Sequence, residues 1–91
     1  MYSKEVVIRN QSGLHARPAS TFVEEAAKYS SRIKVKRPDD EEEIANGKSI
    51  VTILSLSLAQ GDHAVIMANG ADEQEAVEAL AALIDGGFGE L

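Results

Sequence analysis

The sequence contains no cysteine and no tryptophan, and it has only two histidines, His15 and His63. The lack of cysteine excludes disulfides, thiolate metal sites and cysteine nucleophiles, and it fits a reducing compartment. Long hydrophobic runs are also missing. No stretch approaches the roughly 20 apolar residues that span a bilayer, and the first residues lack the apolar core of a signal peptide. We therefore expect a cytoplasmic protein without membrane insertion.

Positive charge is scarce as well. Nine Lys and Arg residues stand against fifteen Asp and Glu residues, for a formal net charge of −6. This excess would repel a phosphate backbone, so nucleic acid is not an expected partner. The 91 residues, 44% of them hydrophobic, are enough for one small core and too few for two. We expect a single domain that spans residues 1–91.

Hydrophobic periodicity predicts the secondary structure of most of the chain. Ala19, Phe22, Val23 and Ala26 follow the i, i+3, i+4, i+7 spacing of an amphipathic helix. The alternation of apolar and basic residues over 32–36 is typical of a strand with one buried face. The expected strands cover 2–8, 32–36 and 63–68, with a short strand near the acidic run 39–43, and the expected helices cover 16–28, a segment after Ser49, and the segment from Asp72 to Gly86.

Segment 47–61 fits both a helix and a strand. Ile50, Ile53 and Leu54 have helical spacing, whereas the leucines of this segment alternate as in a strand. Ser49 is a good N-cap residue, which favours a short helix that begins directly after it.

Acidic residues mark two further local structures. The five consecutive acids at 39–43 predict a turn and a short strand opposite the basic face of Lys34 and Lys36. The alternative for this run is a solvated acidic loop. Asp72 and Glu75 form an Asp-x-x-Glu pattern, which predicts a capping box at the start of the last helix.

The resulting order is β-α-β-β-α-β-α, with no internal repeat and no linker. It predicts an α+β fold, an open-faced β-sandwich in which a four-stranded, mainly antiparallel sheet has three helices on one face.

His15 lies where the first turn meets the first helix, at or next to the N-cap. The unpaired N–H groups of a helix's first turn and the positive end of its dipole form an anion site beside the imidazole. The same partial positive charge disfavours a charged ring, so we expect a neutral, nucleophilic His15. Arg17 adds a guanidinium that can fork onto phosphate oxygens, and Pro18 suits the first turn. The alternative is that His15 only caps the helix and Arg17 is an ordinary surface charge.

Four segments resemble the phosphocarrier protein HPr family. Gly13-Leu14-His15-Ala16-Arg17-Pro18-Ala19-Ser20 is similar to its histidine active-site signature, and Asn46-Gly47-Lys48-Ser49-Ile50 to its regulatory serine motif. Leu58-Ala59-Gln60-Gly61 resembles the turn before the last strand, and Gly70-Ala71-Asp72-Glu73-Gln74-Glu75-Ala76 the start of the last helix. The resemblance covers essentially the whole chain.

The resemblance implies a carrier of the phosphoenolpyruvate-dependent phosphotransferase system. His15 would accept a phosphoryl group on Nδ1 from phospho-enzyme I and pass it to an enzyme IIA domain. The amides of Ala16 and Arg17 and the Arg17 side chain would hold the phosphate. Such a protein is a substrate and donor for other enzymes rather than an enzyme itself, and we expect a monomer that needs no cofactor.

The resemblance also implies a regulatory site and a docking surface. Lys48-Ser49-Ile50 is similar to the segment that HPr kinase/phosphorylase phosphorylates, so Ser49 would be both a helix cap and a regulatory phosphorylation site. Enzyme I and enzyme IIA would dock on a small apolar patch around His15 formed by Ala16, Ser20, Ile50 and Val51. Ile53 and Leu54 are divided between this patch and the core.

Other functions find less support in the sequence. Gly47-Lys48-Ser49 imitates the end of a P-loop, but Glu42 occupies the first glycine position of that motif, which argues against nucleotide binding. His63 lacks a second histidine or a cysteine nearby, so we expect a strand residue at or near the surface and no metal site.

A non-catalytic HPr-like binding module of carbon or nitrogen signalling, such as Crh, remains the main alternative. The ending Gly86-Gly87-Phe88-Gly89 resembles the nitrogen-regulatory branch and Lys48-Ser49 the members controlled by the serine kinase, so sugar uptake and regulation both stay open.

Overall fold

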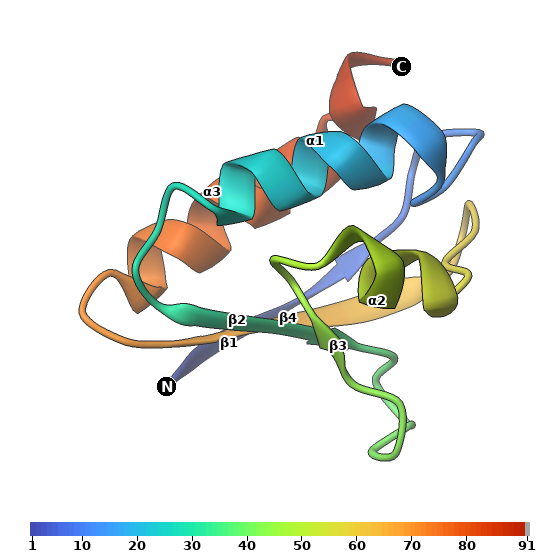
Figure 1. The fold of residues 1–91 in the computed structure, drawn as a ribbon. Coiled ribbons are helices and arrows are strands. Elements are labelled where there is room, and N and C mark those ends of the chain that lie inside the picture. The colour runs from blue at the N-terminus through green and yellow to red at the C-terminus, as the bar shows by residue number, and fades with distance from the viewer. Residues whose placement is uncertain (91) are drawn as a thin grey trace.

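A computed structural model describes residues 1–90 of the chain (Figure 1). The elements follow the predicted order, with one short 3-10 turn added at the C-terminal end. They are β1 (Tyr2–Val7), α1 (Ala16–Ala26), β2 (Arg32–Lys36), β3 (Ala45–Asn46), α2 (Ile50–Ser55), β4 (His63–Asn69), α3 (Glu73–Asp85) and the 3-10 turn η1 (Gly87–Gly89).

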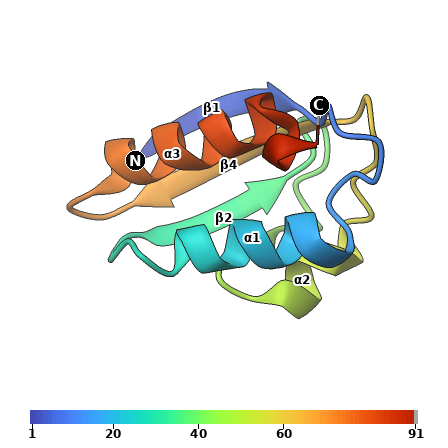
Figure 2. The ribbon, with the colours of Figure 1, turned by 90° about the horizontal axis from the view of Figure 1, so that it is seen from above.

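The four strands form one sheet in the order β1-β4-β2-β3, and every pairing is antiparallel. The central strand β4 places Lys4 opposite Ile66 on one side and Val35 opposite Ile66 on the other. Figures 1 and 2 show the helices on one face of the sheet, with α1 and α3 lying along the strands. The predicted open-faced α+β sandwich is therefore confirmed.

The core lies between the sheet and the helices. Alternate strand residues such as Val6, Ile33 and Ile66 are buried, while their neighbours face away from the helices. Phe22 of α1 and Leu80 of α3 are fully buried against them. The period-two and period-3.6 patterns of the sequence thus point into the same layer, which determines which face of the sheet and which face of each helix is buried.

The helix bounds differ from the expected ones only at their ends. The helix α1 ends at Ala26 rather than Lys28, because Lys28 N–H donates to the carbonyl of Glu25 and Tyr29 N–H to that of Ala26. These i to i−3 bonds tighten the last turn, as is common at helix C-termini.

The predicted capping box at Asp72 is wrong. Asp72 is the N-cap residue of α3, but its side chain makes no capping hydrogen bond. Its carboxylate instead accepts from the N–H groups of Ser30 and Ser31, at 2.9 Å each, and from the Ser31 hydroxyl. These bonds hold the pKa of Asp72 at about 2, the Ser31 hydroxyl being the largest cause and the Ser30 amide the next.

The acidic run 39–43 forms a solvated loop, and the short strand follows it rather than containing it. The strand β3 places Asn46 opposite Lys34. Within the loop, Asp40 accepts from the N–H groups of Glu42 and Glu43, which lower the pKa of the Asp40 carboxyl. Lys36 Nζ pairs with one acid of the run, Glu41, at 2.6 Å, and also donates to the carbonyls of Arg37 and Pro38. Asp39, Glu42 and Glu43 are exposed and form no ion pair within residues 1–90.

No helix in the described part of the chain has the length and apolar character needed to cross a membrane.

Candidate functional site

His15 is the N-cap residue of α1, as the sequence predicts. Its backbone is extended, with φ −126° and ψ 160°, and its side chain makes no capping hydrogen bond. The imidazole is exposed. The interpretation of His15 as a mere capping residue therefore fails, because the ring does not satisfy any backbone N–H of the helix.

The first turn of α1 offers unused donors beside the ring. Neither the Ala16 nor the Arg17 amide donates a hydrogen bond to any acceptor within residues 1–90, and the next residue, Pro18, has no N–H. Arg17 is exposed and forms no ion pair within the same residues. The two residues that follow His15 thus supply two free amides and an unpaired guanidinium at the positive end of the helix dipole, a set of donors that suits a small dianion such as a phosphoryl group.

The loop before His15 is held in place by its backbone. Gly13 has a φ of 67°, and an added Cβ would collide with the carbonyl oxygen of Leu58. The Gly13 amide donates to Asn10 O, at 3.1 Å, and the Leu14 amide to Leu58 O, at 2.9 Å. The Leu14 side chain is fully buried, so it fixes the loop one residue before the histidine.

A second loop, between α2 and β4, supports the first. Arg37 donates through Nη2 to the carbonyls of Leu56 and Ser57 and through Nη1 to the carboxylate of Asp62, at 3.1 Å. Asp62 also accepts from the Ala59 amide, which together with Arg37 lowers the pKa of its carboxyl. This clamp sets the position of the Leu58 carbonyl on which the histidine loop rests.

The C-terminal end of the chain reaches the same loop. Glu90 accepts from Asn10 Nδ2, at 3.2 Å, and from the Ser12 hydroxyl, at 3.1 Å. Asn10 is fully buried, and its Nδ2 also donates to Gly13 O, at 2.9 Å. Sequence reasoning missed the supporting roles of Asn10, Arg37, Asp62 and Glu90, because each depends on a contact between residues far apart in the chain.

Ala16 is strained. Its φ is 50°, in the left-handed region that residues with a Cβ rarely adopt. Holding such a residue there costs of order 1 to 3 kcal/mol and is usual at functional sites. The strain lies in the residue that directly follows the histidine.

The helix α2 lies against the N-terminal half of α1 in both ribbon views (Figures 1 and 2). Ser49 is its N-cap, as predicted, with Oγ accepting from the Thr52 amide at 3.4 Å. Val51 is 73% exposed and Ile50 36%, whereas Ile53 is fully buried. The exposed Ala16 and half-buried Ser20 lie on α1, so the four residues expected to form a patch are all accessible to solvent. Of the two undecided residues, Ile53 belongs to the core and Leu54, at 38%, to the surface.

The other singled-out positions have structural roles. His63 is an exposed strand residue, as predicted, and its Nδ1 lies 2.8 Å from the carboxylate of Glu5. Within residues 1–90, no three His, Cys, Asp or Glu side chains are grouped as metal ligands would be. The Gly47 amide donates to Ile33 O, so this segment is a turn at the sheet edge rather than a phosphate loop.

Comparison with known proteins agrees with this geometry. The sequence model of the family described as "PTS HPr component phosphorylation site" matches residues 2–86. The chain belongs to the HPr family. It is 48% identical over 84 residues to the phosphocarrier protein HPr of Haemophilus influenzae, covering 92% of this chain and 95% of that protein.

Other HPr-family proteins are similar over the same length. The crystal structure of HPr-C-His from Thermoanaerobacter tengcongensis superposes with a TM-score of 0.93 at 44% identity, covering 100% of this chain and 99% of that one. The HPr-like protein Crh of Halalkalibacterium halodurans is 40% identical over 85 residues, covering 93% of this chain and 98% of that protein. Phosphocarriers and HPr-like proteins thus share this fold. The fold alone therefore does not decide between the two functions, and the decision depends on the residues of the site.

Proposed function

We propose that this protein is a histidine phosphocarrier of the phosphoenolpyruvate-dependent phosphotransferase system. His15 accepts a phosphoryl group from phospho-enzyme I and passes it to an enzyme IIA domain. The observation that supports this proposal is the exposed, unbonded imidazole of His15 at a helix N-terminus, beside the free amides of Ala16 and Arg17. A docking module that never carries phosphate has no need of this arrangement.

In the transfer step, the lone pair of His15 Nδ1 forms a bond to phosphorus while the bond from phosphorus to the donor atom of enzyme I breaks. The ring therefore reacts as the tautomer with its proton on Nε2. The amides of Ala16 and Arg17 and the Arg17 guanidinium hold the phosphoryl oxygens. Transfer to enzyme IIA reverses these bond changes, with Nδ1 as the leaving atom.

The protein acts in this scheme as a substrate and donor rather than as an enzyme. Within residues 1–90, neither His15 nor Arg17 is paired with a carboxylate or a second histidine that would serve as a general acid and base. We propose that the chain works as a cytoplasmic, monomeric domain of residues 1–91 without a cofactor. The accessible patch of Ala16, Ser20, Ile50 and Val51 would be the surface on which both partners dock.

Ser49 would be a regulatory phosphorylation site for an HPr kinase/phosphorylase. Its hydroxyl makes only a long bond, 3.4 Å, to the Thr52 amide, so it is free to react without breaking a strong contact. A phosphate there adds a charge of about −1.5 to −2 beside Ile50 and Val51. This charge would weaken docking of an acidic partner surface.

Intact-mass analysis at alkaline pH tests the carrier proposal. The protein is mixed with phosphoenolpyruvate, magnesium and a trace of enzyme I, beside His15→Ala and the matched control His63→Ala. We expect one acid-labile phosphoryl adduct on the wild type and on His63→Ala, and none on His15→Ala. In the same assay, Ser49→Asp should slow transfer and Ser55→Asp, at the other end of α2, should not.

Two results would contradict the proposal. An adduct that survives in His15→Ala places the phosphate elsewhere. No adduct at all, with enzyme I shown to be active on another carrier, would favour the HPr-like binding module.

A further inference from the structure

A hollow of about 390 Å³ lies at the β3 edge of the sheet, between the segment that joins α1 to β2 and the start of α2. Its lining residues include three cationic ones, Arg32, Lys34 and Lys48, and the polar residues Ser30 and Asn46. No carboxylate lines it, although the chain has fifteen Asp and Glu residues and only nine Lys and Arg. A hollow with this charge is unexpected in a protein of net charge −6.

The three cations are not used for ion pairs within residues 1–90. Four of the other cationic side chains do form such pairs there, namely Lys4, Lys28, Lys36 and Arg37. Arg32, Lys34 and Lys48 are therefore available to pair with an anionic ligand.

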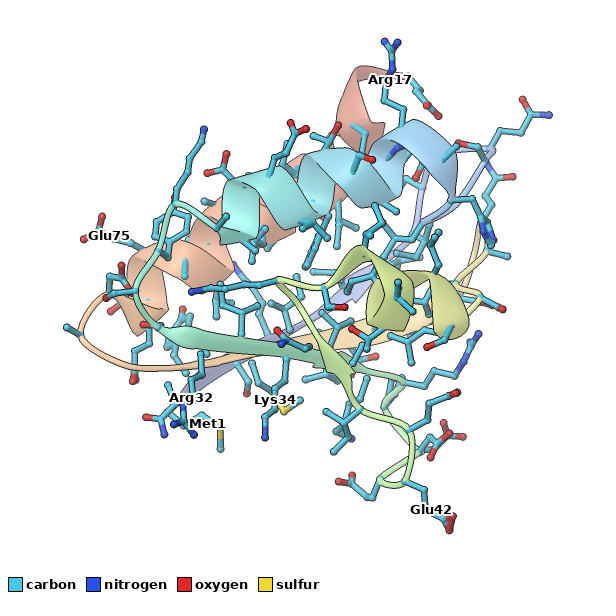
Figure 3. All side chains as sticks on the ribbon, in the orientation of Figure 1. Met1, Arg17, Arg32, Lys34, Glu42 and Glu75 are labelled. Carbon is cyan, nitrogen blue, oxygen red and sulfur yellow. The ribbon has the colours of Figure 1, made fainter. Side chains whose placement is uncertain are left out.

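The strand β2 places two of these cationic residues on the same face of the sheet. Arg32 and Lys34 alternate with the buried Ile33 and Val35, so both side chains stand on the face away from the helices. A second, smaller hollow of about 140 Å³ is lined by the same Arg32 and Lys34 together with Met1. Figure 3 shows Arg32, Lys34 and Met1 below the sheet, whereas Arg17 points away from the sheet beyond the helices.

Asn46, Lys48 and Ile44 give the larger hollow hydrogen-bond donors and an apolar surface. Asn46 accepts from the Lys48 amide through Oδ1, which leaves its NH₂ group free of any partner within residues 1–90. Lys48 Nζ donates one proton to Tyr29 O, at 2.6 Å, and this bond holds the ammonium group at the rim with its other protons available. The exposed Ile44 adds an apolar wall.

We propose that this hollow is a binding site for a small phosphorylated polyanion, of the phosphate-ester or pyrophosphate class. Its volume lies within the range of small-molecule sites. Charge-assisted donors from three side chains suit a ligand with at least two negative charges, and the apolar wall suits the carbon skeleton of an ester. The hollow lies at the β3 edge of the sheet and His15 does not line it, so a ligand bound there leaves the position beside His15 open for phosphoryl transfer.

Amide chemical-shift titration with inorganic pyrophosphate at low salt tests the site, with a sugar phosphate and inorganic phosphate as parallel probes. We expect saturable shifts centred on residues 30–34 and 44–48. Arg32→Gln should weaken binding roughly tenfold, as expected for the loss of one charge-assisted bond. Arg9→Gln removes the same charge from a residue outside the hollow and should change the affinity less than about twofold, because it acts only through the screened long-range field.

The choice of probe separates the two sources of phosphate. Stronger binding of the sugar phosphate identifies an ester, and stronger binding of pyrophosphate identifies an inorganic polyanion. The proposal is overturned if the shifts centre on Ala16 and Arg17, if Arg9→Gln weakens binding as much as Arg32→Gln, if no probe saturates, or if a glutamate-rich peptide binds more tightly than any phosphate.

Discussion

Ala16 has an unfavourable backbone conformation at the point where the phosphoryl group is expected to bind. Its left-handed φ of 50° lies between an N-cap histidine and an exposed arginine, and the Leu14 to Leu58 hydrogen bond fixes the chain just before it. For an L-residue other than glycine, this conformation costs about 1 to 2 kcal/mol. The rest of the fold therefore holds the Ala16 amide in a direction that the free chain would not choose.

Replacing Ala16 by glycine tests this strain. The change removes the clash of the Cβ, and the gain offsets the entropy that glycine adds to the unfolded chain. We expect Ala16→Gly to leave the free energy of unfolding in urea unchanged or slightly higher. The matched control is Ala82→Gly, at an exposed position inside α3, which should lower it by about 1 kcal/mol. Equal losses in the two variants would show that Ala16 is not strained.

At the scale of elements, Asp72 joins the start of α3 to the turn that enters β2. Ser30 and Ser31 donate three hydrogen bonds to its carboxylate. These bonds stabilise the ionised form of Asp72 more than the protonated form. They lower the pKa of Asp72 from 3.8 to about 2. A group whose pKa is lower in the folded state contributes stability above its unfolded pKa, and this contribution is lost as the pH falls toward the folded pKa.

The melting temperature should therefore depend on pH through Asp72. We expect the difference between the wild type and Asp72→Asn to be constant above about pH 5 and to shrink as the pH falls from about 4 to 2. Thermal unfolding followed by circular dichroism at several pH values measures it. Gln74→Ala, at an exposed position of α3 whose side chain does not titrate, should change the melting temperature by the same amount at every pH. A constant difference down to pH 2 for Asp72→Asn would contradict the assignment.

At the scale of the whole molecule, local sequence patterns predict the helices and strands, but they do not predict contacts between residues far apart in the chain. The alternation at 32–36 and the helical spacing of Ala19, Phe22 and Ala26 report burial directly, so strands and helices appear near their expected bounds. His15 and Arg17 lie two residues apart in one motif, which made the candidate site visible. The prediction of a capping box was wrong because the Asp72 carboxylate accepts hydrogen bonds from residues 41 and 42 positions away. No local sequence pattern indicates such distant partners.

The contact between the two ends of the chain is of this long-range kind, and it leads to a further prediction. Removing the Glu90 carboxylate takes away the acceptor of the Ser12 hydroxyl and one of the acceptors of Asn10 Nδ2, which keeps its bond to Gly13 O, so the loop before His15 should open more often. We expect the Gly13 amide, which bonds to Asn10 O, to exchange with deuterium roughly fivefold faster in Glu90→Ala, for the loss of about 1 kcal/mol of hydrogen bonding.

Two controls accompany this exchange measurement by NMR. Glu90→Gln keeps a side-chain oxygen and should restore most of the protection. Glu75→Ala removes an exposed carboxylate on α3 and should leave the Gly13 amide unchanged. Unchanged exchange in Glu90→Ala would mean that the C-terminal segment does not stabilise the loop.

The pairing of β1 with β4 alone determines when the sheet can form during synthesis of the chain. The strand made first, Tyr2–Val7, pairs only with β4, where Val7 lies opposite His63 and Tyr2 opposite Ala68. At about 5 to 20 residues per second, synthesis of the intervening chain takes several seconds. During that time the first strand has no partner in its own chain. The sheet therefore closes only after β4 has been made, and the charged Lys4 and Glu5 of the unpaired strand discourage pairing with a neighbouring nascent chain.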